Sequence, residues 1–222
     1  MSLISRRSCL ALATLAPFTG LGGAFAQSKY PWPDESPRET LRKAAFPNIT
    51  LKTHNGKTVR FYDDLIKDKF VTLNFMYINC ADGTCPVTTY NLKMLQEQLK
   101  HRVGRDMFMY SITVDPKRDS VEMLKNYAEV HGVGPGWLFL RAEPKDTEIL
   151  RRHLGFYDRN PARDANQANH AGMVRFGNEP RQLWGTTSGL ATPRAMARAI
   201  LTADWTGPRP AGATRGVVTG RG

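Results

Sequence analysis

The chain has 222 residues, of which 31 are lysine or arginine and 20 are acidic, so its formal net charge is +11. This length is sufficient for one domain with a substantial core. The positive charge would suit a nucleic-acid-binding protein, but the first residues of the chain argue against that class.

The chain begins with the pattern of an export signal. Residues 5–10, SRRSCL, precede an apolar run that ends in Ala-Phe-Ala at residues 24–26, which is the order of a charged region, an apolar region and a cleavage site. The paired arginines resemble a twin-arginine signal, although Cys9 stands where that motif usually has phenylalanine. An uncleaved membrane anchor is the alternative, but Pro17 and several glycines interrupt a run that barely reaches the roughly 20 apolar residues of a span. We therefore predict that residues 1–26 are removed and that the mature protein is periplasmic, with no stable membrane span.

Export determines which partners and which cysteine chemistry to expect. An exported protein rarely meets nucleic acid, so we expect none as a partner. An anionic partner, an outer membrane surface or simply a soluble basic surface accounts for the charge. Signal removal also takes away Cys9 and leaves Cys80 and Cys85. In an oxidising compartment, two thiols this close in sequence form a disulfide or bind a metal.

Three segments follow the signal. Residues 27–47, which are rich in proline, are predicted to form an extended lead-in, and residues 206–222, rich in glycine and proline, a disordered tail. Residues 48–205 form the predicted domain. Its predicted strands span residues 48–53, 58–65, 69–78, 106–114, 136–142, 172–177 and 181–187, and its predicted helices span residues 85–101, 119–128, 145–155 and 193–203.

The order of these elements predicts the fold class. Asn-Gly at residues 55–56 is a strong hairpin signal between the first two strands, so His54 is expected to be a turn residue. The continuous apolar strands are expected to be buried on both faces. Strands that alternate with helices and then end in a hairpin and a helix predict an α/β protein. The order is that of a thioredoxin-like fold, a central mixed β-sheet flanked by helices, with N-terminal strands and one inserted strand-helix unit.

Cys80 and Cys85 stand where a buried strand gives way to a helix. Pro86 suits the first turn of that helix, and Thr84 is the candidate N-cap residue. A thiol at a helix N-terminus experiences the positive end of the helix dipole, which favours the thiolate. Asp-Gly at residues 82–83 provides a turn, so we expect the two sulfurs to approach each other and to be partly exposed.

Three interpretations of this pair compete. A structural disulfide across so short a loop would contribute at the low end of the roughly 2–4 kcal/mol that is typical of disulfides. A redox-active dithiol and a soft-metal site are the alternatives, and they do not exclude each other. His170 favours the metal, because it lies on the loop that enters the strand at residue 172, and in a thioredoxin-like fold that loop lies beside the tip of the first helix. Two thiolates and one imidazole suit Cu(I), whereas zinc normally requires a fourth ligand.

At this point the sequence resembles the Sco (SenC) family of exported copper-binding proteins. The resemblance is carried by the strand VTLNFMYINC, the Cys-loop-Cys-Pro element, the segment SITVDPKRDSVEMLKNYAE, and His170 with Gly172 and Met173. It implies a thioredoxin-like fold and a Cu(I)/Cu(II) site formed by Cys80, Cys85 and His170. It also implies a role in maturing the copper centre of cytochrome oxidase or of another exported copper enzyme, by delivering metal or by reducing the target's cysteines. The family usually has three residues between its cysteines, whereas this chain has four, and we expect the glycine-containing loop to accommodate the extra residue.

The remaining candidates have structural explanations. Asp119 is expected to cap the helix that follows it. Asp115 ends a strand near the site and is a candidate for orienting the cysteine loop or His170 through a hydrogen bond, although a plain turn residue is an equal alternative. Met76 and Met173 are expected in the core, and His101, His131 and His153 on the surface.

The leading functional hypothesis is a metallochaperone rather than an enzyme. It would capture copper and pass it to an exported apo-enzyme such as an oxidase subunit. The alternative is a thiol-disulfide oxidoreductase, in which Cys80 attacks a partner disulfide, Cys85 resolves the intermediate and a thiol reductant restores the pair. Such enzymes favour a Cys-x-x-Cys spacing and a cis-proline before the strand that faces it, and no proline lies between Pro161 and Pro180. A redox or copper sensor would use the same atoms.

Overall fold

The computed structural model describes residues 40, 42, 44–166 and 172–204. All of these residues belong to one compact unit of the chain. The predicted signal and the whole of the predicted tail therefore lie outside the described residues. None of the helices that the structure describes is both long enough and apolar enough to cross a membrane.

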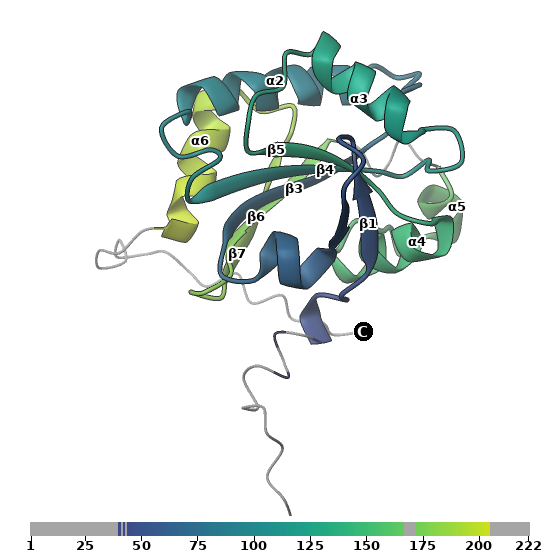
Figure 1. Ribbon diagram of the computed structural model, residues 1–222, viewed down its shortest axis with the longest axis horizontal. Helices are drawn as coiled ribbons and strands as arrows, with labels where there is room; N and C mark the ends of the chain where they lie inside the picture. Colours follow the sequence, from purple (N-terminus) through teal and green to yellow (C-terminus); the bar gives the residue numbers. More distant parts are fainter. Residues whose placement is uncertain (1–39, 41, 43, 167–171, 205–222) are drawn as a thin grey trace, which may run out of the picture. The chain divides into compact units, whose positions relative to one another are not determined.

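The described residues form one mixed, seven-stranded sheet with helices on both faces (Figure 1). The strands are β1 (Thr50–Thr53), β2 (Thr58–Arg60), β3 (Phe70–Met76), β4 (Met107–Thr113), β5 (Trp137–Arg141), β6 (Met173–Asn178) and β7 (Leu183–Ser188). The helices are the π-helix η1 (Phe61–Ile66), the α-helices α2 (Thr84–Gln98), α3 (Val121–Val130), α4 (Pro144–His153), α5 (Pro161–Asp164) and α6 (Pro193–Leu201), and the short 3-10 helix η3 (Thr202–Asp204). The strand order across the sheet is β2-β1-β5-β4-β3-β6-β7. The predicted succession of strands and helices is confirmed.

The three central strands are parallel and end at the same edge of the sheet, which we call the carboxyl edge. β4 pairs in parallel with β3 from Phe70–Met107 to Met76–Thr113, and also pairs in parallel with β5. All seven residues of β3 are buried, because helices cover both faces of the sheet. β6 is antiparallel to β3, so it begins at the carboxyl edge, where Val174 pairs with Asn74.

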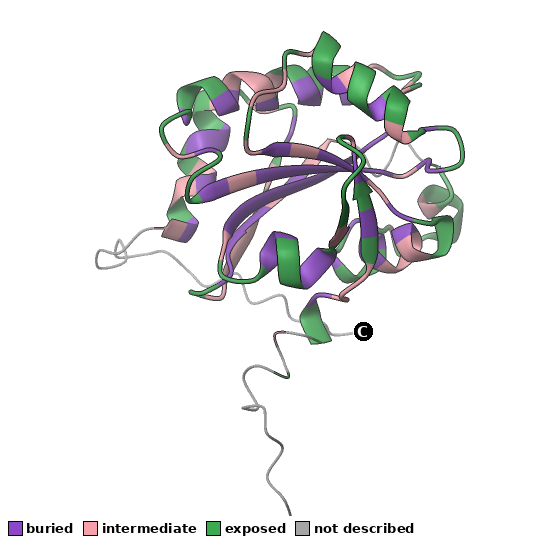
Figure 2. Ribbon diagram, in the orientation of Figure 1, coloured by how far each residue is buried: buried purple, intermediate pink, exposed green. Residues whose placement is uncertain are grey.

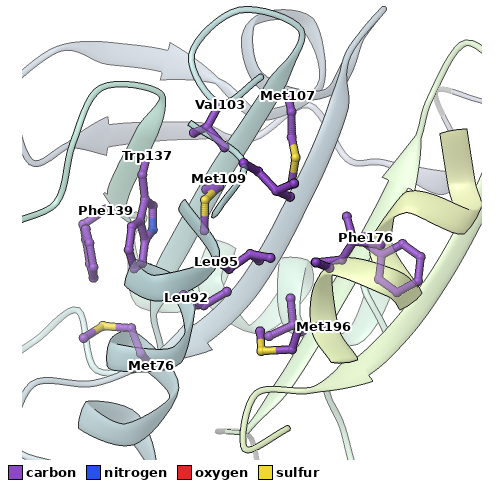
Figure 3. Close-up of a cluster of buried hydrophobic side chains, with 14 of the residues drawn as sticks. Met76, Leu92, Leu95, Val103, Met107, Met109, Trp137, Phe139, Phe176 and Met196 are labelled. Atoms are coloured by element: carbon purple, nitrogen blue, oxygen red, sulfur yellow. The ribbon is translucent and has the colours of Figure 1, made fainter. Parts of the chain in front are cut away.

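Two layers of helices enclose the sheet in two hydrophobic clusters (Figure 2). On one face, α2, α3 and α6 cover a cluster in which Leu92 and Leu95 of α2 pack toward the sheet residues Met109 and Trp137 (Figure 3). On the other face, η1 and α4 cover a second cluster around Phe75. Both leucines are buried, and the helix predicted over residues 85–101 is confirmed in α2.

The predicted N-terminal hairpin is present, but its second strand is shorter than predicted. β1 and β2 are antiparallel, and Gly56 in the turn has a φ of +80°, a conformation that glycine adopts without strain. The strand predicted over residues 58–65 ends at Arg60, and η1 follows at once. Side-chain acceptors draw this segment out of the sheet, because the Tyr62 amide donates to Asn48 Oδ1 at 3.1 Å and the Arg60 amide to Asp64 Oδ2 at 2.6 Å.

Other boundaries also differ from the predictions. The cap of α3 is Ser120, whose hydroxyl accepts from the Met123 amide, and not Asp119. The short helix α5 was not predicted; Asn160 caps it by accepting from the Ala162 amide. Within the lead-in that was expected to be extended, residues 40, 42, 44 and 45 are helical.

Candidate metal centre

The two cysteines lie on a tight loop at the carboxyl edge, between β3 and α2. Gly83 has a φ of +74°, and its amide donates to the Cys80 carbonyl at 3.3 Å, which turns the chain back on itself. The Cys85 amide, in the first turn of α2, donates to Cys80 Sγ at 3.3 Å. Both side chains are free thiols. As predicted, the Asp-Gly turn brings Cys80 to the tip of α2, beside Cys85. The expectation that a copper site accommodates the four-residue spacing is not tested.

Asp82 organises this loop. Its Oδ1 accepts from the Cys80 thiol at 3.0 Å and from the Thr84 amide at 3.0 Å. These two donors, the Cys80 thiol first, lower the pKa of the Asp82 carboxyl. The residue before α2 is Gly83, without a side-chain cap, so the prediction that Thr84 is the N-cap was wrong. The Asp82 side chain accepts the hydrogen bond of the Thr84 amide instead.

The two thiols lie in different environments. Cys80 is half-buried, whereas Cys85 is 1% exposed and packs in the cluster under α2. Burial, together with the contact with Cys80, raises the pKa of the Cys85 thiol. The expectation of two partly exposed thiols with thiolate character is therefore wrong for Cys85, because desolvation opposes the helix dipole there.

Tyr77 completes the buried side of the loop. It is 7% exposed, and burial and a hydrogen bond with Cys80 raise the pKa of its phenol to about 12. At neutral pH the phenol is therefore uncharged, and it is an uncharged hydrogen-bonding partner for the Cys80 sulfur.

Asp119, and not Asp115, connects the cysteine loop to the rest of the edge. Asp119 Oδ2 accepts from the Ile78 amide at 3.3 Å and from the Thr113 hydroxyl at 2.5 Å, and the residue is 1% exposed. Burial raises the pKa of its carboxyl, an effect that these two hydrogen bonds oppose. The Asp115 carboxylate pairs with Arg118, which is exposed. The contact with the cysteine loop that was predicted for Asp115 is made by Asp119. The alternative prediction, that Asp115 orients His170, is not tested, because His170 lies outside the described residues.

The segment that enters β6 meets the first turn of α2. A Cβ atom added at Gly172 would lie 3.1 Å from Thr84 Cγ2, and the Gly172 carbonyl accepts from the Gly189 amide at 2.6 Å. His170, two residues before Gly172, lies outside the described residues, so its predicted position beside the cysteines is not tested. Among the residues that the structure does describe, no three histidine, cysteine or acidic side chains are grouped to hold a metal ion.

The other candidates lie away from the cysteines or in the core. Met76 is 1% exposed in the core under α2, and Met173 packs against the second cluster, as predicted. His54 lies in the hairpin turn, where its Nδ1 accepts from the Phe139 amide at 3.0 Å and burial lowers its pKa. His101 and His153 are exposed, as predicted, whereas His131 is half-buried, with its ring centroid 4.3 Å from that of Tyr127 and the two rings tilted by 41°.

Known proteins resemble this chain in sequence and in fold. A protein of Stutzerimonas stutzeri that is named for copper binding is 29% identical over 114 residues, which are 51% of this chain and 53% of that protein. The chain therefore spans about half the length of this curated relative.

Three solved structures share the fold at low sequence identity. A SCO1/SenC family lipoprotein from Bacillus anthracis has a TM-score of 0.58 at 20% identity and covers 72% of this chain and 95% of its own. Arabidopsis thaliana ScoI with copper bound has a TM-score of 0.56 at 18% identity, covering 70% of this chain and 95% of its own. BsSco is described as having a disulfide switch and as a member of the Sco family of cytochrome c oxidase assembly proteins. It has a TM-score of 0.56 at 21% identity, and the match covers 70% of this chain and 90% of BsSco.

These similarities confirm the predicted thioredoxin-like α/β fold. The family described as SCO1/SenC matches residues 38–203, which is well over half of the chain and includes every described strand and both cysteines. The chain therefore belongs to the SCO1/SenC family.

Proposed function

We propose that this protein binds copper through Cys80, Cys85 and His170 and helps to assemble the copper centre of cytochrome c oxidase or of another exported copper enzyme. The observation that carries the proposal is the convergence of the two thiols at the tip of α2, where the Cys85 amide lies 3.3 Å from Cys80 Sγ. Two sulfur donors on one short loop select soft metal ions.

Chain connectivity supports His170 as the third ligand. Gly172 lies against Thr84, the residue before Cys85. Consecutive Cα atoms are about 3.8 Å apart, so the Cα of His170 lies within about 7.6 Å of the Cα of Gly172. His170 is therefore only two residues from a position that contacts the first turn of α2, beside the cysteine loop. A donor set of two sulfurs and one nitrogen suits Cu(I).

The burial of Cys85 fits a metal ligand. Its neutral thiol is favoured in the folded protein, since burial raises its pKa. A bound cation would reverse that preference, because thiolate and not thiol ligates the metal. Copper binding would then release protons. A partner's thiolate would reach the copper from the side of Cys80, because that cysteine is only half-buried.

The names of the related proteins support the same function. One solved relative is described with copper bound, and another as a member of a family of oxidase assembly proteins. An apo-oxidase subunit is accordingly the recipient that we propose. For localisation, the twin-arginine pattern supports export to the periplasm, and the lipoprotein relative supports an exported or membrane-anchored protein.

A thiol-disulfide oxidoreductase is the second candidate. It is favoured by the asymmetry of the pair, since a half-buried Cys80 suits the attacking thiol and a buried Cys85 the resolving one. BsSco is named for a disulfide switch. In this reaction the two protein thiols would be oxidised to a disulfide while the partner's disulfide is reduced to two thiols.

Anaerobic Cu(I) titration of the reduced protein tests the proposal. We expect one tightly bound copper per chain. Loss of a residue that only hydrogen-bonds to a metal ligand typically weakens metal affinity by roughly 10–100-fold. Because His170 is the proposed ligand itself, we expect His170→Ala to weaken copper affinity by at least that factor. His153→Ala, which removes an exposed histidine on α4, is the matched control. Unchanged affinity in His170→Ala would exclude the proposed ligand set, and disulfide exchange that survives in that variant would favour the oxidoreductase.

A further inference from the structure

An exposed apolar patch lies beside the cysteine loop. Val87 and Tyr90 on α2 are 48% and 61% exposed, and Leu190 before α6 is 55% exposed. We call these three side chains the α2–α6 patch. Single exposed apolar residues are ordinary. Val87 and Tyr90, however, lie within two turns of Cys85 on α2, and Leu190 follows Gly189, which contacts the same helix.

Contacts between α2 and the loop before α6 bring the patch together. Asn91 Nδ2 donates to the Gly189 carbonyl at 2.9 Å, and a Cβ atom at Gly189 would lie 2.6 Å from Thr88 Cγ2. Leu190 follows Gly189, and Val87 and Tyr90 flank Thr88 at a spacing of three residues, which places them on one side of the helix. In Figure 1, α2 and α6 lie on the same face of the sheet.

The α6 side of the patch is positively charged. Arg194 and Arg198 are exposed on α6 at a spacing of four residues. Residues 183–203 contain no acidic residue, and the acid of α2, Glu97, is paired with Lys93 at 2.6 Å. The described residues of α2 and α6 therefore leave both arginines uncompensated by a neighbouring carboxylate.

We propose that the α2–α6 patch, with Arg194 and Arg198, is the docking surface for the exported protein that reacts with Cys80 and Cys85. The docking segment is apolar and acidic, because it covers three apolar side chains and faces two cations. A second copy of this chain fits poorly, since a symmetric contact would bring the same arginines together. The inference rests on the proposed function only in that the partner must reach the cysteine loop.

Thiol-disulfide exchange with synthetic peptides tests the docking surface without copper. Two peptides would carry the same Cys-x-x-x-Cys disulfide and one leucine, one flanked by aspartates and the other by lysines. In the reaction, Cys80 attacks the peptide disulfide and releases one peptide thiol. Cys85 then attacks the mixed disulfide and releases the second, so the protein is oxidised as the peptide is reduced.

We expect the acidic peptide to be reduced roughly tenfold or more faster than the basic one at low salt, and the difference to shrink as salt screens the charges. The double variant Arg194→Glu/Arg198→Glu should reverse the preference, and Tyr90→Ser should slow reduction of the acidic peptide. The matched control Lys52→Glu/Lys57→Glu makes the same change of net charge on the β1–β2 hairpin, at the other end of the strand order, and should retain the preference.

Equal rates for the two peptides, or equal effects of the two double variants, would overturn the docking surface. Binding to vesicles of phosphatidylglycerol and phosphatidylcholine that requires both arginines, without a peptide preference, would overturn it in favour of a membrane. Cu(I) stoichiometry, measured in the same variants, separates this outcome from failure of the copper proposal. One copper per chain with no peptide preference rejects the docking surface alone, whereas a peptide preference without copper binding rejects the metal site alone.

Discussion

Replacing Asp119 with alanine removes the carboxylate that connects the cysteine loop to the carboxyl edge. In the native protein, this carboxylate accepts hydrogen bonds from the Ile78 amide and the Thr113 hydroxyl, in a site where Asp119 is 1% exposed. Alanine leaves the buried Thr113 hydroxyl and the part-buried Ile78 amide without this acceptor. The same substitution at Asp115 removes a carboxylate whose side-chain partner, Arg118, is 62% exposed.

The expected magnitudes follow from burial. A buried donor left without a partner costs about 1–3 kcal/mol, so two of them, partly offset by removal of a buried charge, predict a loss of about 3 kcal/mol for Asp119→Ala. For a domain of this size that loss lowers Tm by about 6–12 °C. The Asp115 side chain is 11% exposed, but solvent screens its ion pair because Arg118 is exposed. Such a pair contributes no more than about 1 kcal/mol, so we expect Asp115→Ala to cost about 1 kcal/mol, clearly less than Asp119→Ala.

Urea unfolding of the reduced protein at neutral pH, followed by far-ultraviolet circular dichroism, measures both values. Amide hydrogen exchange at Ile78 adds a local readout, because that amide loses its acceptor in Asp119→Ala and keeps it in Asp115→Ala. Equal destabilisation by the two substitutions, or unchanged exchange at Ile78, would show that the assignment of the loop contact to Asp119 is wrong.

Three further predictions concern the rest of the domain. Gly136→Ala should cost more than about 2 kcal/mol in urea unfolding, because its Cβ would lie 2.2 Å from the Gly104 amide nitrogen at a positive φ; Gly56→Ala, with a similar φ and open space, should cost about 1 kcal/mol. Glu179→Ala should cost about 3–5 kcal/mol, because it leaves Arg42 and the donors around a fully buried carboxylate unpaired, and a loss below 1 kcal/mol would contradict this. Hydrogen bonds from an arginine lower the pKa of Glu148 from its ordinary 4.5, so its stabilising effect is present above that value and lost as the pH falls through the lowered pKa. The difference in unfolding free energy between the native protein and Glu148→Gln should therefore shrink below pH 4.5, and a difference that grows with acidity would refute the sign.

Local patterns predicted most of the fold. Asn-Gly marked the first hairpin, and the continuous apolar run over residues 69–78 marked a strand buried on both faces, as β3 is. The strand predicted over residues 58–65 ends early because its backbone amides find side-chain acceptors in Asn48, 14 residues before Tyr62, and in Asp64. The apolar pattern does not reveal these hydrogen bonds. The apolar residues 61, 62, 65 and 66 have a helical spacing, which is the sequence signal for η1.

The site was predictable in part for the same reason. The cysteine loop is local, so the strand end, the Asp-Gly turn and the helix start could be read from consecutive residues. The contact between Ile78 and Asp119 could not, because it exists only through the parallel pairing of β3 with β4, which aligns Met76 with Thr113. A buried aspartate beside a serine was indistinguishable in the sequence from a helix cap.

The ion pair of Arg42 with Glu179, at 2.8 Å, fastens the beginning of the domain to the amino end of β3, since Asn178 pairs with Phe70 there. β3 has seven residues, and at about 3.3 Å per residue the cysteine loop lies roughly 20 Å further along the sheet. Arg42 and the thiols therefore lie at opposite ends of the sheet, and a partner that approaches the cysteine loop does not have to displace this ion pair.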